Sequence, residues 1–213
     1  MLQLFRRLLL ILLVRPFAKL VIGMDVHGRM NLPTSGPAIV AANHNSHIDT
    51  LLLLCLFPSG LLHRVRPLAA ADHFLKSRLS AWVSLNIVGI LPVMRGRVGR
   101  NVDVLAESRA ALERAEILLI FPEGTRGEAE EMGPLKSGIA RLAEAFPNAP
   151  VVPVYLQGAG RVLPRRARIL VPFNCSAIVG TPLRWMGDRS LFMAELKTAL
   201  ETLRSDAPPL RWL

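Results

Sequence analysis

The sequence is poor in cysteine, and this shortage excludes two common kinds of site. Its two cysteines, Cys55 and Cys175, lie far apart, and neither a C-x-x-C pair nor a Cys/His cluster with zinc spacing occurs. We therefore expect two buried free thiols, which fits a reducing compartment. Aromatic residues are also scarce, at 6% of the chain, so aliphatic side chains must build most of the core.

Acidic residues are few as well, and this gives the chain a strongly basic balance. It has 16 Asp and Glu against 26 Lys and Arg, for a formal net charge of +10. Such a surface suits nucleic acid, an anionic membrane or an anionic substrate. No DNA- or RNA-binding signature occurs, and 51% of the residues are hydrophobic. The composition therefore favours an anionic membrane surface as the partner, and not nucleic acid.

The N-terminal segment lacks an apolar run that is long enough to cross a bilayer. Within residues 1–24 the uninterrupted run extends only from Leu8 to Val14, whereas a spanning helix needs about 20 apolar residues. A secretory signal peptide is disfavoured, because no small-residue cleavage site follows the run. We expect residues 1–24 to form an amphipathic helical segment that lies on the membrane and is divided by Pro16. The alternative is a terminal helix that packs on the protein's own core.

The rest of the chain, residues 25–213, alternates short apolar strands with amphipathic helices. Strands are expected at residues 37–42, 65–71, 87–93, 117–121, 151–156, 169–171 and 177–179, and helices at residues 50–57 and 74–85 and around residues 104–112, 139–146 and 192–203. This alternation predicts a single α/β domain, with a largely parallel central sheet flanked by helices. In such sheets functional sites form where strands end, and two polar motifs fall at predicted strand ends.

The first motif, residues 43–49, reads N-H-N-S-H-I-D and pairs a histidine with a carboxylate. His44 and Asp49 are five positions apart, which would point them to different sides of a continuous helix. They meet only if His44 lies in a turn and Asp49 in the first turn of the following helix. The carboxylate then fixes the imidazole tautomer, and His44 can act as a general base on a substrate hydroxyl.

Two other interpretations of this motif stay open. Ser46 and Asp49 match a capping box, with Ser46 as N-cap and Asp49 three residues later. Capping is compatible with catalysis, because it also places Asp49 on the first helical turn. The third interpretation takes His44, His47 and Asp49 as metal ligands, although no further ligand cluster appears in the sequence.

The second motif, residues 121–126, reads F-P-E-G-T-R and follows a short apolar strand. Gly124 lets the backbone turn sharply, and Thr125 and Arg126 can bind phosphate oxygens. No Walker A loop and no G-x-S-x-G elbow occurs, which disfavours a P-loop enzyme and an α/β-type serine hydrolase. The alternative is an ordinary polar turn with a surface ion pair.

Taken together, the motifs resemble those of the lysophospholipid acyltransferase family, whose best-known member makes phosphatidic acid from lysophosphatidic acid. Four blocks match in the family's order, namely N-H-x-S-x-x-D at residues 43–49, G-x-x-x-x-x-R at 89–95, F-P-E-G-T-R at 121–126 and V-P-V at 152–154. The piece Leu135-Lys136-Ser137-Gly138 is also similar to the family. The resemblance extends over about residues 35–180.

The resemblance implies a role for each matching residue. His44 would be the general base and Asp49 its partner, and Arg95 would help to hold the acceptor's phosphate. The run Glu123, Gly124, Thr125 and Arg126 would bind the glycerophosphate part, and Pro153 with its flanking valines would shape the acyl-chain side. The reaction would need no metal and no cofactor, because the donor is a thioester of coenzyme A or acyl carrier protein.

The implied function is an O-acyltransferase that acylates the free hydroxyl of a lysophospholipid, with 1-acylglycerol 3-phosphate as the foremost acceptor. Its place would be the cytoplasmic face of the plasma membrane, bound peripherally or monotopically. One alternative is an acyltransferase for another lipid acceptor, such as an ornithine-type lysolipid, glycerol phosphate or another lysophospholipid. The other is a catalytically idle lipid-binding protein of the same fold.

Overall fold

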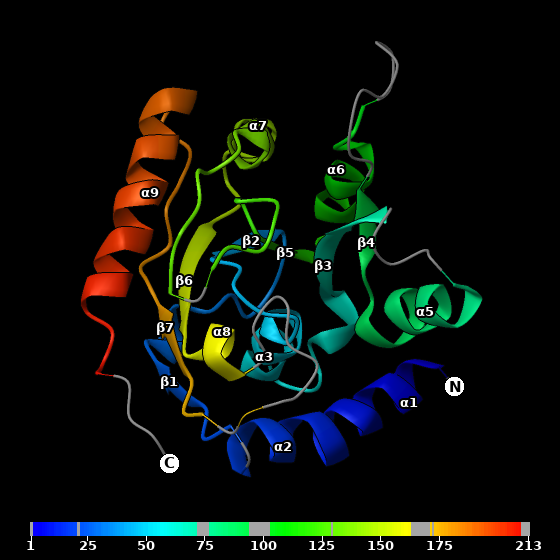
Figure 1. Ribbon diagram of the computed structural model, residues 1–213. Coiled ribbons are helices and arrows are strands. Elements are labelled where there is room, and N and C mark those ends of the chain that lie inside the picture. The colour runs from blue at the N-terminus through cyan, green and yellow to red at the C-terminus, as the bar shows by residue number, and fades with distance from the viewer. Residues whose placement is uncertain are drawn as a thin grey trace.

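A seven-stranded sheet forms the centre of the computed structural model, which describes residues 2–20, 22–71, 77–93, 103–128, 130–162, 171 and 173–209 (Figure 1). The strands are β1 Asp25–His27, β2 Ala38–Ala42, β3 Val65–Ala70, β4 Leu91–Val93, β5 Ile117–Ile120, β6 Val151–Gln157 and β7 Ser176–Val179. Their order is β1-β7-β6-β2-β5-β3-β4, and every neighbouring pair is parallel except β6–β7. The predicted α/β domain with a largely parallel sheet is confirmed.

Helical segments cover both faces of this sheet. The α-helices are α1 Leu2–Leu9, α2 Arg15–Leu20, α3 Asp49–Leu56, α5 Arg78–Val83, α6 Ala106–Glu113, α7 Gly138–Ala145, α8 Ala159–Val162 and α9 Arg189–Ser205. Shorter segments are the π-helical η1 Leu10–Val14 and η4 Ser84–Val88, and the 3-10 turns η2 Arg29–Asn31 and η3 Leu62–Arg64.

The central strands bury both faces, which explains their unbroken apolar sequences. Along β2, Val40 packs with α3 and with Leu10 of the N-terminal helix, whereas its neighbours Ile39 and Ala41 pack with α6, α7 and α9. The same alternation follows β5. The molecule is therefore a three-layer sandwich in which the edge where the parallel strands end stays available for a site.

Several predicted element bounds differ from the structure. Residues 87–93 were expected to form one strand, but Ile87 and Val88 belong to η4 and only Leu91–Val93 is a strand. Gly89 separates them with a φ of 77°, a left-handed conformation that a short apolar run does not reveal. The predicted helix at 74–85 begins at Arg78 within the described residues, and most of the predicted strand at 169–171 lies outside them.

The N-terminal segment is helical from Leu2 to Leu20, so the prediction that Pro16 divides it into two pieces is wrong. The turn before the proline is widened, because the Arg15 N–H bonds to the Leu10 carbonyl five residues back. This π-helical turn accommodates Pro16, which has no N–H of its own to donate. Among the described residues, no helix is both long and apolar enough to cross a membrane.

One side of this N-terminal helix packs on the domain, as the alternative interpretation expected. Arg6, Leu10 and Ala18 lie on the same stripe of the helix, and all three are almost fully buried. The opposite stripe, with Leu8, Leu12 and Leu20, is exposed although it is apolar. The segment thus contacts the core and presents a second apolar face outward.

The two cysteines are both free, as expected. Cys175 is buried and Cys55 only half-buried. Burial raises the pKa of the Cys55 thiol to about 11, against a smaller opposite effect of Arg15, and raises that of Cys175 to about 12. Both side chains therefore stay as neutral thiols at physiological pH and behave as packing residues.

Candidate active site

The two polar motifs meet at one edge of the sheet. Strands β2 and β5 are parallel neighbours, and Ala41 of β2 pairs with Ile120 of β5. The residues that follow them, 43–49 and 121–126, therefore leave the sheet side by side. The chain order alone, with more than seventy residues between the motifs, does not imply this proximity.

The His44–Asp49 pair has the geometry of a general base and its orienting carboxylate. His44 Nδ1 lies 2.8 Å from Asp49 Oδ2, with His44 in the loop and Asp49 at the first residue of α3. A carboxylate can only accept, so Nδ1 carries the proton and Nε2 keeps its lone pair. The Asp49 side chain is 1% exposed and that of His44 is 20% exposed. The imidazole is therefore accessible to a substrate, while the Asp49 carboxylate is shielded from solvent.

The same carboxylate oxygen also orders the loop that carries the histidine. Asp49 Oδ2 accepts the backbone N–H groups of Asn45 and Ser46, both at 2.8 Å. The Ser46 bond is the one that the acidic residue of a capping box makes, but the N-cap of α3 is Ile48, which makes no side-chain cap bond. The prediction of Ser46 as N-cap with Asp49 three residues later is therefore wrong, because the helix begins at Asp49 itself, and from that position the carboxylate reaches the imidazole.

Glu123 links the two motifs through backbone hydrogen bonds. Its Oε1 accepts the His44 N–H at 2.8 Å, and its Oε2 accepts the Gly133 N–H at 2.7 Å. Burial raises the pKa of this carboxyl, although the two backbone N–H bonds act in the opposite direction. Because both oxygens face the protein, Glu123 is better placed to hold the His44 loop than to contact the glycerophosphate part of a substrate.

A ring contact and a backbone bond hold His44 further. The Phe121 ring stacks on the imidazole, with centroids 4.1 Å apart and planes at 17°. The His44 carbonyl accepts the Gly127 N–H at 2.8 Å. His44 is thus held on its ring face, at its backbone and at Nδ1, which is the preorganisation that a general base would need.

The rest of the second motif forms a tight turn beside the pair. Gly124 has a φ of 71°, and a Cβ on it would lie 2.6 Å from Lys136 Nζ. Thr125 is exposed in the same turn, and the guanidinium of Arg126 contacts the imidazole of His47. The structure therefore brings the predicted residues Glu123, Gly124, Thr125 and Arg126 beside His44.

Lys136 is a site residue to which the sequence interpretation gave no role. Its side chain lies over Gly124, and its backbone N–H bonds to the Pro122 carbonyl at 2.8 Å. It adds a second cation to the turn that carries Arg126. The sequence feature that could have identified it is the family-like piece Leu135-Lys136-Ser137-Gly138, which contains this lysine.

Asn43 and Asn45 also received no role from the sequence, and both position the loop. The Asn43 side chain accepts the Leu156 N–H at 2.7 Å and donates to the Leu156 carbonyl at 2.9 Å, which ties the loop to β6. Asn45 donates to the Glu131 carbonyl at 2.8 Å. Their position beside His44 in the first block could have indicated a role at the site. Their hydrogen-bond partners could not be predicted, because these lie 113 and 86 residues away in the sequence.

An apolar pocket of about 190 Å³ opens beside this site. Phe121, Pro122, Gly124 and Lys136 are the lining residues from the second motif and the loop over it, and most other lining residues come from β3, β4, β5 and α7. The pocket is lined mainly by apolar side chains, with Lys136 as its cationic member. Such a lining suits a hydrocarbon chain that carries an anionic group near Lys136.

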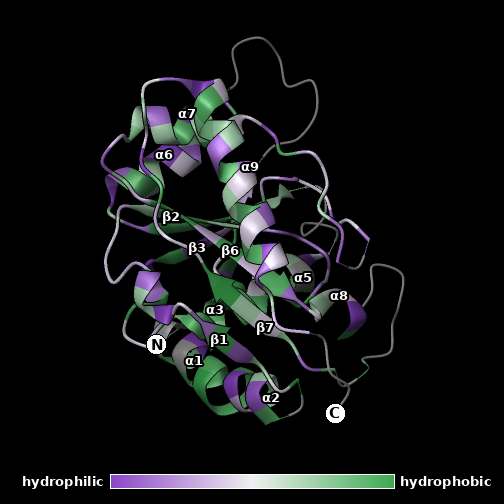
Figure 2. Ribbon diagram, turned by 90° about the vertical axis from the view of Figure 1, so that its left-hand side faces the viewer, coloured by the Kyte–Doolittle hydropathy of each residue, from purple (hydrophilic) through white to green (hydrophobic). Residues whose placement is uncertain are grey.

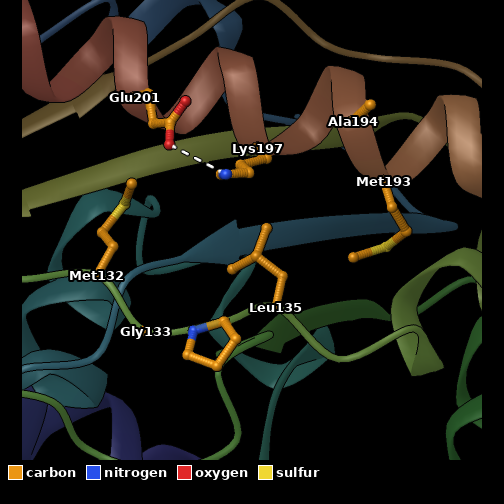
Figure 3. A pocket seen from close by; sticks show the side chains of 8 residues that line it. Met132, Gly133, Leu135, Met193, Ala194, Lys197 and Glu201 are labelled. Atoms are coloured by element: carbon orange, nitrogen blue, oxygen red, sulfur yellow. Dashed lines mark ion pairs between the residues drawn. The ribbon is translucent and has the colours of Figure 1, made fainter.

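A larger hollow of about 340 Å³ lies between the 132–135 loop and α9 (Figure 3). Met132, Leu135 and Met193 line it, and the Lys197–Glu201 ion pair lies along its α9 side. None of its residues belongs to the four sequence blocks, and its Gly133 donates a backbone N–H bond to Glu123. The smaller pocket, by contrast, is lined by residues of the second motif.

Two predicted contributions are not seen at this site. Arg95 lies outside the described residues. Pro153 and its flanking valines are buried within β6 and do not line the pocket beside His44. Within the described part of the chain, no group of three or more His, Cys, Asp or Glu side chains is placed to hold a metal ion.

Comparisons with known proteins agree with this geometry. A family model described as Acyltransferase matches residues 23–157. The chain is 30% identical over 152 residues to 1-acyl-sn-glycerol-3-phosphate acyltransferase BAT2, chloroplastic, of Brassica napus, covering 71% of this chain and 41% of the relative. It is 27% identical over 163 residues to 1-acyl-sn-glycerol-3-phosphate acyltransferase alpha of Homo sapiens, covering 76% and 55%. The chain thus spans about half the length of these relatives.

The fold also has a solved counterpart. The structure of the 1-acyl-sn-glycerophosphate (LPA) acyltransferase PlsC from Thermotoga maritima superposes with a TM-score of 0.73. The match covers 96% of this chain and 82% of the other, at 18% sequence identity. At that identity the likeness shows the shared fold, and the chemistry must be argued from the residues at the site.

Proposed function

Because this chain belongs to the Acyltransferase family, we propose that it moves a fatty acyl group from a thioester to the free hydroxyl of a lysophospholipid. The observation that carries the proposal is the His44–Asp49 hydrogen bond of 2.8 Å, beside an apolar pocket that is lined by Phe121, the ring that stacks on His44. Relatives named 1-acyl-sn-glycerol-3-phosphate acyltransferases make lysophosphatidate the first acceptor to test, with phosphatidic acid as the product.

The chemistry follows from the free lone pair on His44 Nε2. It takes the proton from the acceptor hydroxyl while the oxygen attacks the thioester carbonyl carbon. The imidazolium that forms is stabilised by Asp49 through Nδ1. When the tetrahedral intermediate collapses, the C–S bond breaks and the thiolate takes the proton back from the imidazolium. The cycle restores the base and consumes no metal or redox partner.

The cations around the turn provide the place for the acceptor's phosphate. Arg126 offers a guanidinium fork, and Lys136 adds an ammonium group beside Gly124. Arg95, of the second block, is proposed as a further phosphate ligand. Glu123 is assigned to positioning, because its oxygens accept the His44 and Gly133 N–H groups.

The apolar pocket provides room for an acyl chain near the reacting atoms. Phe121, which stacks on His44, is one of its lining residues, so a chain in the pocket lies close to the base. The donor is proposed to be an acyl thioester of coenzyme A or acyl carrier protein. The intact base and its partner weigh against the idle lipid-binding alternative, whereas another lysolipid acceptor is compatible with the same geometry.

A panel of substrates tests the proposal directly. Radiolabelled acyl-CoA and acyl carrier protein donors are combined with lysophosphatidate, glycerol 3-phosphate, other lysophospholipids and an ornithine-type lysolipid, and products are separated by chromatography. We expect phosphatidic acid from lysophosphatidate as the major product. A different major product would assign a different acceptor to the enzyme. Absence of product with every donor and acceptor pair would favour the lipid-binding alternative.

Arg126→Ala is expected to weaken use of phosphate-bearing acceptors more than use of a neutral analogue. The variant loses a charge-assisted fork, and hydrogen bonds to charged groups contribute about 1.5–3 kcal/mol, so KM should rise about tenfold or more. Arg126→Lys should recover part of this effect. Steady-state kinetics with both acceptors measure it, with Arg141→Ala, an exposed arginine on α7, as the matched control. An unchanged KM would remove Arg126 from the phosphate site.

The N-terminal helix is proposed to hold the enzyme on the cytoplasmic face of the plasma membrane, where a one-chain acceptor resides. Its outward stripe is apolar, with Leu12 and Leu20 exposed, and Lys19 lies beside it. Apolar side chains that enter the interface and basic ones that meet lipid phosphates act together in such segments. Because the other stripe is part of the core, deleting residues 1–24 would also expose buried surface, so single substitutions are the better test.

A further inference from the structure

Exposed apolar side chains gather on two segments of the structure. Of the fifteen large apolar side chains that are strongly exposed among the described residues, ten lie on the N-terminal helix or on the α5–η4 segment. The first segment carries Leu4, Phe5, Leu8, Leu12, Leu13 and Leu20. The second carries Leu79, Trp82, Val83 and Leu85. Soluble surfaces seldom concentrate apolar side chains in this way without a partner.

The two segments are neighbours and are fastened to each other. Helix α1 contacts η4, which directly follows α5 in the chain. The Arg6 guanidinium, 1% exposed, donates to the Val88 carbonyl at 2.9 Å and to the Val65 carbonyl at 3.2 Å. A Cβ on Gly89 would lie within 2.8 Å of this guanidinium. Arg6 therefore fixes α1 against the end of η4, so the N-terminal helix and the α5–η4 segment are joined as one structural unit.

Basic side chains stand at the far end of the same unit. A hollow of about 460 Å³ between α2 and the end of α3 is lined by Arg15, Lys19 and Arg29, with Asp25 as the acidic member of its lining. In Figure 2 the N-terminal helices carry both green hydrophobic and purple hydrophilic residues. Apolar side chains beside an excess of basic ones match the boundary between acyl chains and anionic headgroups.

We propose that α5 and η4 form a second bilayer contact, which joins the N-terminal helix in a single docking surface for an anionic membrane. Trp82 has the amphipathic ring that is favoured at the headgroup level, and Leu79 beside it is 74% exposed. Both segments are held by the same buried arginine, so they meet the bilayer together. A single short helix binds a bilayer weakly, and a second apolar element multiplies the affinity.

The docking surface has a consequence for the site, which rests on the proposed function. Segment η4 ends at Val88, and the second sequence block begins at the next residue, Gly89. Contact of η4 with the bilayer brings the start of that block to the headgroup level, where the phosphate of a lysolipid lies. The docking itself does not depend on any catalytic step.

Vesicle co-sedimentation of the full chain tests the proposal. Vesicles of phosphatidylcholine with phosphatidylglycerol are compared with phosphatidylcholine alone, for the double variants Leu79→Ser/Trp82→Ser and Leu12→Ser/Leu13→Ser. The matched control is Met186→Ser/Leu191→Ser, since these side chains are 48% and 55% exposed but lie elsewhere. We expect each of the first two variants to lower the partition coefficient about tenfold, because each loses two inserted apolar side chains, and the control to leave it unchanged.

Fluorescence gives an independent reading of the α5 contact. Emission of the wild-type protein should shift to the blue when vesicles are added, and Trp82→Phe should remove that shift. Normal vesicle binding by Leu79→Ser/Trp82→Ser would overturn the proposal. So would conversion of a dimer to a monomer by this variant without vesicles, since α5 would then bind a second copy. If vesicle binding fails in the expected variants while the donor and acceptor panel gives no product, the docking surface stands and the proposed function does not.

Discussion

Replacement of His44 by alanine is expected to lower the rate of acyl transfer by about a hundredfold to ten-thousandfold, the usual effect of losing a general base. This corresponds to about 3–5 kcal/mol of transition-state stabilisation. The proton of the acceptor hydroxyl would have to leave to water, because Nε2 is the atom that receives it. Single-turnover and steady-state rates with a thioester donor and lysophosphatidate measure the loss.

The expected loss is chemical and not structural. The His44 side chain is 20% exposed, and its core contact is the stacked Phe121 ring, so thermal unfolding should change little. His63→Ala is the matched control, because His63 is exposed on η3 and far from the motif in sequence. A folded His44→Ala protein with near-wild-type turnover would rule out the mechanism.

The second large effect is expected from Asp49→Asn. One oxygen of Asp49 accepts three hydrogen bonds, from His44 Nδ1 and from the Asn45 and Ser46 N–H groups. The amide oxygen of asparagine can take its place, so the loop keeps its shape but loses the charge that stabilises the imidazolium. We expect kcat to fall at least about tenfold, the difference between a charged and a neutral hydrogen bond. The fall would approach about ten-thousandfold if the imidazole tautomer inverted, as in a serine protease triad.

Stability separates the catalytic role of Asp49 from helix capping. Asp49 Oδ1 is buried and has no hydrogen-bond partner among the described residues, so an amide NH₂ there would cost about 1–3 kcal/mol of unfolding free energy. Rates are therefore compared at a temperature where the variant is fully folded. Ser46→Ala provides the control, since it removes only the hydroxyl that accepts the Ile48 N–H just before α3 and keeps the Asp49 carboxylate. If Asp49→Asn changed only the melting temperature, Asp49 would be a capping residue and no more.

The features that could be predicted from the sequence are those that depend on residues close together in the chain. The apolar runs at residues 38–42, 117–120 and 151–157 are strands, and residues 189–205 form the C-terminal helix. The His44–Asp49 arrangement was predicted because both residues lie within six positions, where backbone geometry alone decides whether they can meet. The element bounds failed where a single dihedral angle mattered, as at Gly89, and where a π-helical turn absorbed Pro16.

The α/β class, the motif chemistry and the pairing of His44 with Asp49 could thus be predicted from the chain alone, since these depend on periodicity and short spacing. The contact of Glu123 with the His44 backbone, 79 residues away, and the position of Lys136 over Gly124 became visible in the folded molecule. So did the contact by which Arg6 joins α1 to η4, 82 residues along the chain. Such contacts depend on strand order and on packing between layers, and strand order is a property of the whole fold that no local pattern contains.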